Sequence, residues 1–138
     1  MARVLGIDPG TKRCGIAVTD SGPTMAFPRP AIARDDATMA RLRALVDEEA
    51  IAVIVIGRPI ALSGRKTAST SDADQLFSQV QENFEGVPVI QFDERLTTQE
   101  AQKSLSEAGL TTKASRERLD SAAAVIMLQN YVDGLNAE

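Results

Sequence analysis

The fold is decided by residues 3–19, which read RVLGIDPGTKRCGIAVT. Two apolar, β-type runs flank a turn that contains Pro9 and Gly10. Because proline fixes φ and glycine tolerates positive φ, this pattern predicts a β-hairpin. In a strand, every second residue shares a face, so Asp8 lies on the same face as Val4 and ends the first strand. A carboxylate at the end of an otherwise apolar face requires an explanation.

The size and composition of the chain predict one soluble domain. It has 138 residues, of which 43% are hydrophobic and 25% charged, which suits a single globular core. We therefore expect one domain over residues 1–138. No apolar run approaches the ~20 residues that span a membrane, and the N-terminus does not resemble a secretory signal. We expect a cytoplasmic protein with no membrane partner.

The scarcity of histidine and cysteine excludes several kinds of chemistry. The chain has no histidine, and Cys14 is its single cysteine. An internal disulfide, the usual zinc sites and Ser-His-Asp or Cys-His catalysis are therefore excluded. The net charge of −4 also argues against broad, nonspecific nucleic-acid binding. Any hydrolytic chemistry must depend on carboxylates, lysine or a metal.

Apolar periodicity predicts the remaining elements. Residues 25–33 form an edge strand, because Pro28 and Pro30 cannot donate to a ladder. We then expect the following elements: a helix at 37–50 capped by Asp35 or Asp36, a buried strand at 51–56, a long loop at 58–70, a helix at 71–84 opened by a Ser71–Asp74 capping box, a strand at 87–92, and helices at 97–108 and 116–133. The order βββαβαβα predicts an α/β fold, a mixed five-stranded sheet with helices on both faces.

Three acids are expected to meet at one end of this sheet. Asp8 and Glu94 follow strands expected to be parallel neighbours, and Asp120 lies on the final helix. Two of the three have a simpler explanation as well: Asp8 as a turn residue, and Asp120 as a boundary residue on a solvated face. Asp93 is better explained as a hydrogen-bond acceptor at a strand end than as a metal ligand.

Three carboxylates in contact repel one another unless a cation neutralises them. Oxygen ligands without histidine favour Mg²⁺ or Mn²⁺ over zinc. Two such ions about 4 Å apart can hold the attacking and leaving oxygens of a phosphodiester. The predicted reaction is therefore two-metal phosphodiester hydrolysis.

Basic side chains in neighbouring loops are candidates for contacts with the phosphates of a nucleic acid. These candidates are Lys12, Arg13, Arg58, Arg65, Lys66, Arg95 and Arg116. On sequence alone, the charges near Arg116 fit a solvated helix start equally well.

Four motifs, in order, resemble the YqgF family, also called RuvX. They lie at residues 6–20, 56–59, 93–101 and 120–129 and read GIDPGTKRCGIAVTD, IGRP, DERLTTQEA and DSAAA followed by LQ. The resemblance implies the RNase H-like fold of RuvC resolvases. It also implies a nuclease acting on Holliday junctions or maturing the 5′ end of pre-16S rRNA, with Asp8, Glu94 and Asp120 as metal-binding acids.

The chain departs from the family pattern at Arg58, where leucine is usual, and in the more basic loop at 62–67. Two alternatives stay open. One is a non-catalytic RNA-binding factor for ribosome assembly on the same fold. The other is an actin-like ATPase lobe, which the Asp8 hairpin also resembles, although such enzymes need two lobes. The choice between rRNA precursor and branched or single-stranded DNA is open, as is a homodimer, which a resolvase needs for symmetric cutting.

Overall fold

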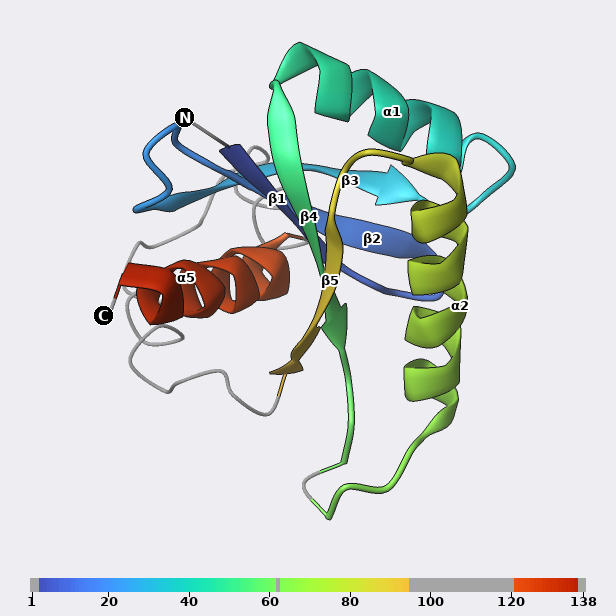
Figure 1. The fold of residues 1–138 in the computed structure, drawn as a ribbon. Coiled ribbons are helices and arrows are strands. Elements are labelled where there is room, and N and C mark those ends of the chain that lie inside the picture. The colour runs from blue at the N-terminus through green and yellow to red at the C-terminus, as the bar shows by residue number, and fades with distance from the viewer. Residues whose placement is uncertain (1–2, 62, 95–120, 137–138) are drawn as a thin grey trace, which may run out of the picture.

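The computed structural model describes residues 3–61, 63–94 and 121–136. Its elements, in chain order, are β1 (Arg3–Asp8), β2 (Arg13–Thr19), β3 (Ala26–Ala33), α1 (Thr38–Glu48), β4 (Ile51–Arg58), α2 (Ala68–Asn83), β5 (Val89–Asp93) and α5 (Ala122–Asn136). The strands form one five-stranded sheet in the order β3-β2-β1-β4-β5 (Figure 1). The predicted mixed α/β sheet is confirmed.

The strand directions bring three strand ends together. β1 pairs with β2 in antiparallel fashion and with β4 in parallel, and β4 pairs in parallel with β5. The carboxyl ends of β1, β4 and β5 therefore share one end of the sheet. Asp8, Arg58 and Asp93 occupy those three ends.

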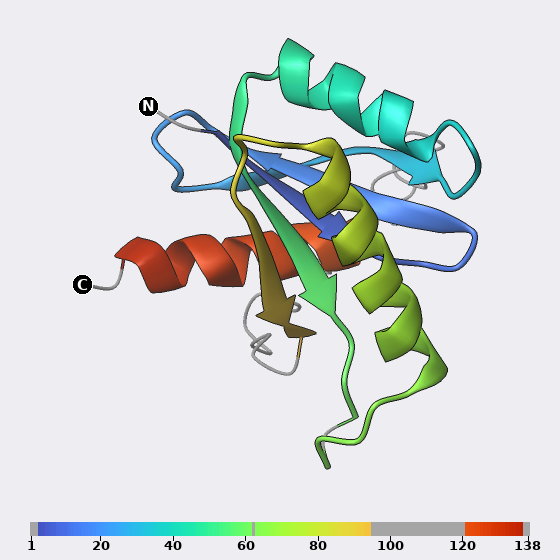
Figure 2. The same ribbon diagram turned by 45° about the vertical axis from the view of Figure 1, so that its right-hand side comes forward.

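Helices cover both faces of the sheet, as the sequence predicts. The views in Figures 1 and 2 place α1 and α2 on one face and α5 on the other. Alternate residues of each strand serve the two cores: Leu5 and Ile7 pack toward α1 and α2, whereas Val4 packs toward α5. The aliphatic run of β4 is divided in the same way, since Ile54 belongs to the first core and Val55 to the second. A strand covered on both faces needs this continuous apolar sequence.

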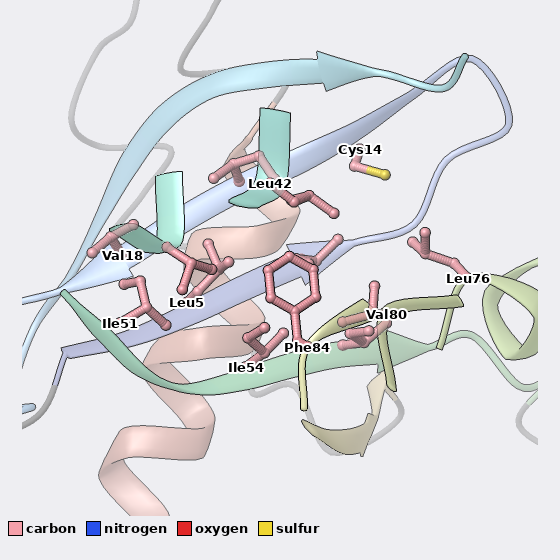
Figure 3. Packing of buried hydrophobic residues seen from close by; sticks show 13 residues of the cluster. Leu5, Cys14, Val18, Leu42, Ile51, Ile54, Leu76, Val80 and Phe84 are labelled. Carbon is pink, nitrogen blue, oxygen red and sulfur yellow. The ribbon is translucent and has the colours of Figure 1, made fainter. Parts of the chain in front are cut away.

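The core beneath α1 and α2 is closed by side chains from both helices. Figure 3 shows Leu42 of α1 and Leu76 and Val80 of α2 above the strands. Phe84, which follows α2, fills the same layer and is 4% exposed. On the other face α5 approaches the sheet closely at Gly6, where an added Cβ would lie 2.9 Å from Cβ of Leu128. Glycine at position 6 therefore lets the helix pack on the strand.

β3 forms one edge of the sheet, and its exposed backbone is protected. The N–H of Ala26 donates to Oε1 of Gln129 on α5 (2.9 Å). Two residues further along the same edge, Pro28 has no N–H to offer, and neither has Pro30. The loss of these three donors makes the edge a poorer template for another strand.

A serine hydroxyl enters the ladder between β2 and β3. The pairing of these strands shifts register between Cys14 and Ile16. There, the N–H of Ile16 donates to Oγ of Ser121 (3.0 Å), and this hydroxyl donates to the carbonyl of Arg29 (2.6 Å). Ser121 is fully buried. It thereby satisfies both backbone groups at the β-bulge and fixes the start of α5 on the sheet.

Two predicted helix starts are wrong. α2 begins at Ala68, because Thr67 and Thr70 form the capping box, rather than Ser71 and Asp74. The loop after β4 is therefore shorter than 58–70. The N-cap of α1 is Ala37 without a side-chain cap, and the carboxylate of Asp35 instead accepts the N–H of Ala37. Short polar residues are frequent in both stretches, so several capping positions compete.

The last predicted strand and helices need separate comment. β5 spans Val89–Asp93 rather than 87–92, and α5 is confirmed as the final helix from Ala122. The predicted helix at 97–108 and the first residues of the one at 116–133 lie outside the described residues.

Candidate functional site at the carboxyl end of the sheet

Two of the three predicted acids meet. Asp8 ends β1 and Glu94 follows β5, with β4 between them. The two side chains are hydrogen bonded to each other. Gly57 of β4 leaves room for the Glu94 side chain, because a Cβ added at position 57 would lie only 3.1 Å from the carboxyl carbon of Glu94. The carboxyl group of Glu94 therefore lies across the bare backbone of the central parallel strand.

This contact changes the acidity of Glu94. Burial of the side chain, and then the hydrogen bond and negative charge of Asp8, raise the pKa of Glu94 to about 8, with a smaller contribution from Asp93. At neutral pH the pair thus retains a proton, because two adjacent carboxylates cannot both ionise cheaply. Among the ion pairs of the described residues, none neutralises Asp8 or Glu94.

The donor chemistry of the pair fits a divalent cation. Both groups offer oxygen atoms, which Mg²⁺ and Mn²⁺ prefer, and a cation would replace the shared proton. In the part of the chain that the structure describes, no three potential metal ligands gather. The third predicted acid, Asp120, lies outside the described residues.

Ser121, the residue after Asp120, is fixed by a hydrogen bond to β2. Ser121 bonds to the N–H of Ile16, and Ile16 pairs across the ladder with Ile7, the neighbour of Asp8. α5 therefore begins at the end of the sheet where Asp8 and Glu94 meet.

Asp93 and Arg58 belong to the opposite face of the sheet. They are partners in the β4–β5 register, and the Arg58 guanidinium donates to both carboxylate oxygens of Asp74 on α2 (2.9 and 3.1 Å). Gln91 donates to the same carboxylate (2.8 Å). The hydrogen bonds from Arg58 and, to a lesser extent, from Gln91 hold the pKa of Asp74 below its usual value. Because side chains alternate along β5, Asp93 is directed away from Glu94.

The predicted phosphate contacts therefore differ in their surroundings. Arg58 is held by Asp74, whereas four others are exposed near the carboxyl end of the parallel strands. They are Lys12 in the turn between β1 and β2, Arg13 at the start of β2, and Arg65 and Lys66 in the loop after β4. None of these four belongs to an ion pair within the described residues. The loop that carries Arg65 and Lys66 projects beyond the sheet (Figures 1 and 2). Arg95 and Arg116 lie outside the described residues.

Three residues of this region escaped the sequence analysis. Gly57 directly follows the strand predicted at 51–56, and this position gives no sign of the Glu94 contact. Asp74 was assigned to a cap, and Arg34 was not singled out. A signal for both was available: acids two residues apart near the start of a helix, Asp72 and Asp74, are well placed to pair with arginines at neighbouring strand ends.

Comparison with known proteins decides the family. The model of the RuvX family, described as Holliday junction resolvase, matches residues 2–134. The chain belongs to the RuvX family.

Relatives named "Putative pre-16S rRNA nuclease" support this assignment to RuvX. The relative from Leifsonia xyli is 41% identical over 135 residues, which cover 96% of this chain and 86% of that protein. The relative from Geobacillus kaustophilus is 36% identical over 135 residues, 95% of this chain and 97% of that protein.

Solved structures confirm the fold of this RuvX-family chain. T. thermophilus RuvC in complex with a Holliday junction substrate aligns with a TM-score of 0.70 at 15% identity, covering 99% of this chain and 96% of that one. The fowlpox virus Holliday junction resolvase aligns with a TM-score of 0.57 at 10% identity, covering 96% of this chain and 99% of that one. The RuvC-like, RNase H-like fold predicted from the sequence is thus confirmed.

Proposed function

We propose that this RuvX-family domain is a metal-dependent endonuclease that hydrolyses phosphodiester bonds in structured nucleic acid. The observation that carries the proposal is the contact between Asp8 and Glu94 across Gly57. Two carboxylates in contact at the carboxyl end of the parallel strands repel each other when both are ionised, and a bound cation would neutralise that repulsion. Membership of a nuclease family supports the same conclusion.

Asp8, Glu94 and Asp120 are the proposed ligands of Mg²⁺ or Mn²⁺. The contact of Ser121 with Ile16 supports Asp120, since it anchors the adjacent residue beside the other two. When bound, a pair of such ions would activate water and stabilise the departing 3′ oxygen. The three carboxylates would then act fully ionised, with Gly57 leaving room for Glu94.

The exposed cations are the proposed contacts with the substrate backbone. Lys12 and Arg13 follow Asp8, and Arg65 and Lys66 occupy the projecting loop, so phosphates on either side of the scissile bond would meet positive charge. Arg95 and Arg116 remain predictions of the same kind. Arg58 would contact phosphate only by leaving Asp74.

The names of the relatives and structural neighbours supply two candidate substrates, pre-16S rRNA and four-way DNA junctions. Both are cytoplasmic in bacteria, where we expect the protein to act. Across the described ranges, no helix is long and apolar enough to cross a membrane. Symmetric cutting of a junction would require a homodimer, whereas 5′-end maturation of rRNA would not.

A cleavage panel tests the proposal. Precursor rRNA, a four-way DNA junction and single-stranded DNA are each incubated with Mg²⁺, Mn²⁺ or EDTA. We expect at least one substrate to be cut with metal and none with EDTA. Asp8→Asn and Asp120→Asn should each abolish cutting without changing the circular dichroism spectrum. If nothing is cut but RNA is bound equally well by wild type and variants, the ribosome-assembly factor is the correct alternative.

A further inference from the structure

Arg34 contacts the turn that follows Asp8. It lies directly after β3, and its guanidinium Nη1 donates to the carbonyl of Gly10 (2.9 Å). Its backbone N–H donates to the carbonyl of Lys12 (2.9 Å). One residue thus binds two carbonyls of the turn between β1 and β2.

The same guanidinium is attached to α2. Nη1 and Nη2 of Arg34 donate to the two carboxylate oxygens of Asp72 (3.0 and 3.2 Å). The side chain of Arg34 is 16% exposed and that of Asp72 is 26% exposed. A partly buried, two-point ion pair of this kind is geometrically specific. Arg34 therefore connects the turn to α2, which carries Asp72.

The turn itself is tightly folded. A Cβ added at Gly10 would lie 2.3 Å from the carbonyl oxygen of Arg13, so only glycine permits the close approach of these two segments. Lys12, between them, is exposed, and so is Arg13. Arg34 therefore fixes the backbone of the turn, while the side chains of Lys12 and Arg13 are exposed to solvent.

We propose that Arg34 is a positioning residue for the nuclease reaction. By binding Gly10 and Asp72 at once, it fixes the turn that begins at Asp8 and presents Lys12 and Arg13 to the substrate. This inference rests on the proposed function, but the brace itself is a property of the protein without metal or substrate.

Lysine cannot replace arginine in this role. The guanidinium is a planar group with donors pointing in several directions, so it serves a carbonyl and both oxygens of a carboxylate together. The lysine ammonium is a point charge on a flexible chain and would retain one partner at a time. Arg34→Lys should therefore keep the charge but lose the brace.

Arg29 offers a matched control. It also forms a two-point ion pair, with Glu49 (2.6 and 2.9 Å), and its side chain is 33% exposed. It lies on β3, the strand that Arg34 follows, and does not contact the turn. Arg29→Gln should therefore reproduce the loss of an ion pair without loosening the turn.

The first measurement is local and needs no metal. Trypsin cuts after Lys12 and Arg13 only when the turn opens, and mass spectrometry identifies these products. Well below the unfolding temperature, we expect Arg34→Gln to be cut there about tenfold faster than wild type, since a charge-assisted hydrogen bond is lost. Arg34→Lys should show most of this increase and Arg29→Gln none.

The second measurement is cleavage of the preferred substrate. We expect kcat/KM to fall about tenfold in Arg34→Gln and in Arg34→Lys. Losses of this size are typical of residues that do not touch the substrate themselves but orient the groups that do. Arg29→Gln should retain the wild-type value. Asp72→Asn, which leaves Arg34 and its bond to Gly10 in place, gives a milder variant should Arg34→Gln fail to fold.

The outcomes separate the two hypotheses. If Asp8→Asn abolishes cleavage but Arg34→Gln and Asp72→Asn lose no more than Arg29→Gln, the positioning role is overturned. Unchanged trypsin cutting at the turn in these variants overturns the brace itself. If wild type cuts no substrate, the proposed function fails, while the trypsin experiment still decides whether Arg34 holds the turn.

Discussion

Two half-buried glutamates at opposite ends of the sheet have opposite surroundings. Glu49, between α1 and β4, accepts hydrogen bonds from Arg29 (2.6 Å) and Arg3 (3.0 Å). The Arg29 hydrogen bond holds the pKa of Glu49 below its usual value. Glu94 instead contacts Asp8, and its pKa is raised to about 8. Arginines of the protein neutralise the carboxylate at the amino end, whereas among the described residues no basic side chain forms an ion pair with Asp8 or Glu94 at the other end, where we propose that a cation binds.

The largest expected effect is the loss of cleavage activity when Glu94 is replaced. Glu94→Gln removes a proposed metal ligand, so we expect cleavage to fall by more than about 100-fold, beyond the 10- to 100-fold typical of residues behind the ligands. Asp93→Asn changes the neighbouring acid, which belongs to the other face, and should retain most of the activity. Equal losses in both variants would contradict the assignment of Glu94.

A second prediction concerns stability at the amino end. Glu49→Gln leaves Arg29 and Arg3 without their shared carboxylate, and we expect the free energy of unfolding to fall by about 1 kcal/mol, because both arginines are partly solvated. The Tm should then fall by about 3 °C. Cleavage below the unfolding temperature should stay at the wild-type level. A loss of cleavage under these conditions would contradict a purely structural role for Glu49.

A third prediction uses pH to distinguish the two ends. In the metal-free protein, folded Glu94 keeps its proton up to about pH 8, whereas in the unfolded chain it ionises near its ordinary pKa. Between these values the folded state binds more protons, so stability falls as pH rises. Glu49, with a lowered pKa, contributes stability that is lost as pH falls instead.

Thermal melts from pH 5 to 8 in EDTA check this sign. We expect Glu94→Gln to flatten the decline toward pH 8, and Mg²⁺ or Mn²⁺ to oppose the decline in wild type. A wild-type profile that Glu94→Gln leaves unchanged would show that another group titrates.

The smallest expected effect comes from Gly57→Ala. The new methyl group would lie 3.1 Å from the carboxyl carbon of Glu94, so that side chain must move by a few tenths of an ångström. We expect metal affinity, measured by calorimetry, to weaken by less than about tenfold. Gly22→Ala is the control, because its methyl group would meet nothing within 4 Å. Unchanged affinity in Gly57→Ala would mean that Glu94 tolerates the displacement.

Much of the fold follows from local sequence. The Pro9–Gly10 turn, the aliphatic run of β4 and the prolines of β3 each allow one main interpretation, and together they fix the sheet. Helix starts were predicted less well, since Thr67, Ser71 and Asp35 all have side chains that cap helices and only tertiary packing chooses among them. The meeting of Asp8 with Glu94 was predictable because parallel neighbouring strands end together.

The surroundings of the site were not predictable in the same way. Whether Arg58 projects to solvent or pairs with Asp74 depends on how α2 lies over β4, which no local pattern encodes. The contact of Gly57 with Glu94 and the reach of Arg34 to Gly10 are also long-range. Such contacts depend on ångström-scale geometry that residue spacing does not specify.

The hydroxyl of Ser121 in the β2–β3 ladder also constrains when the protein can finish folding. Its partner Ile16 is 105 residues away in the chain, and the Gln129 contact with Ala26 spans 103 residues. During synthesis, the N-terminal strands therefore leave the ribosome long before the groups that complete their pairing. The pairing of β2 with β3, beside the hairpin that carries Asp8, is completed only by Ser121 at the start of α5, so a chain truncated before Ser121 would carry the acid but not the finished sheet beside it.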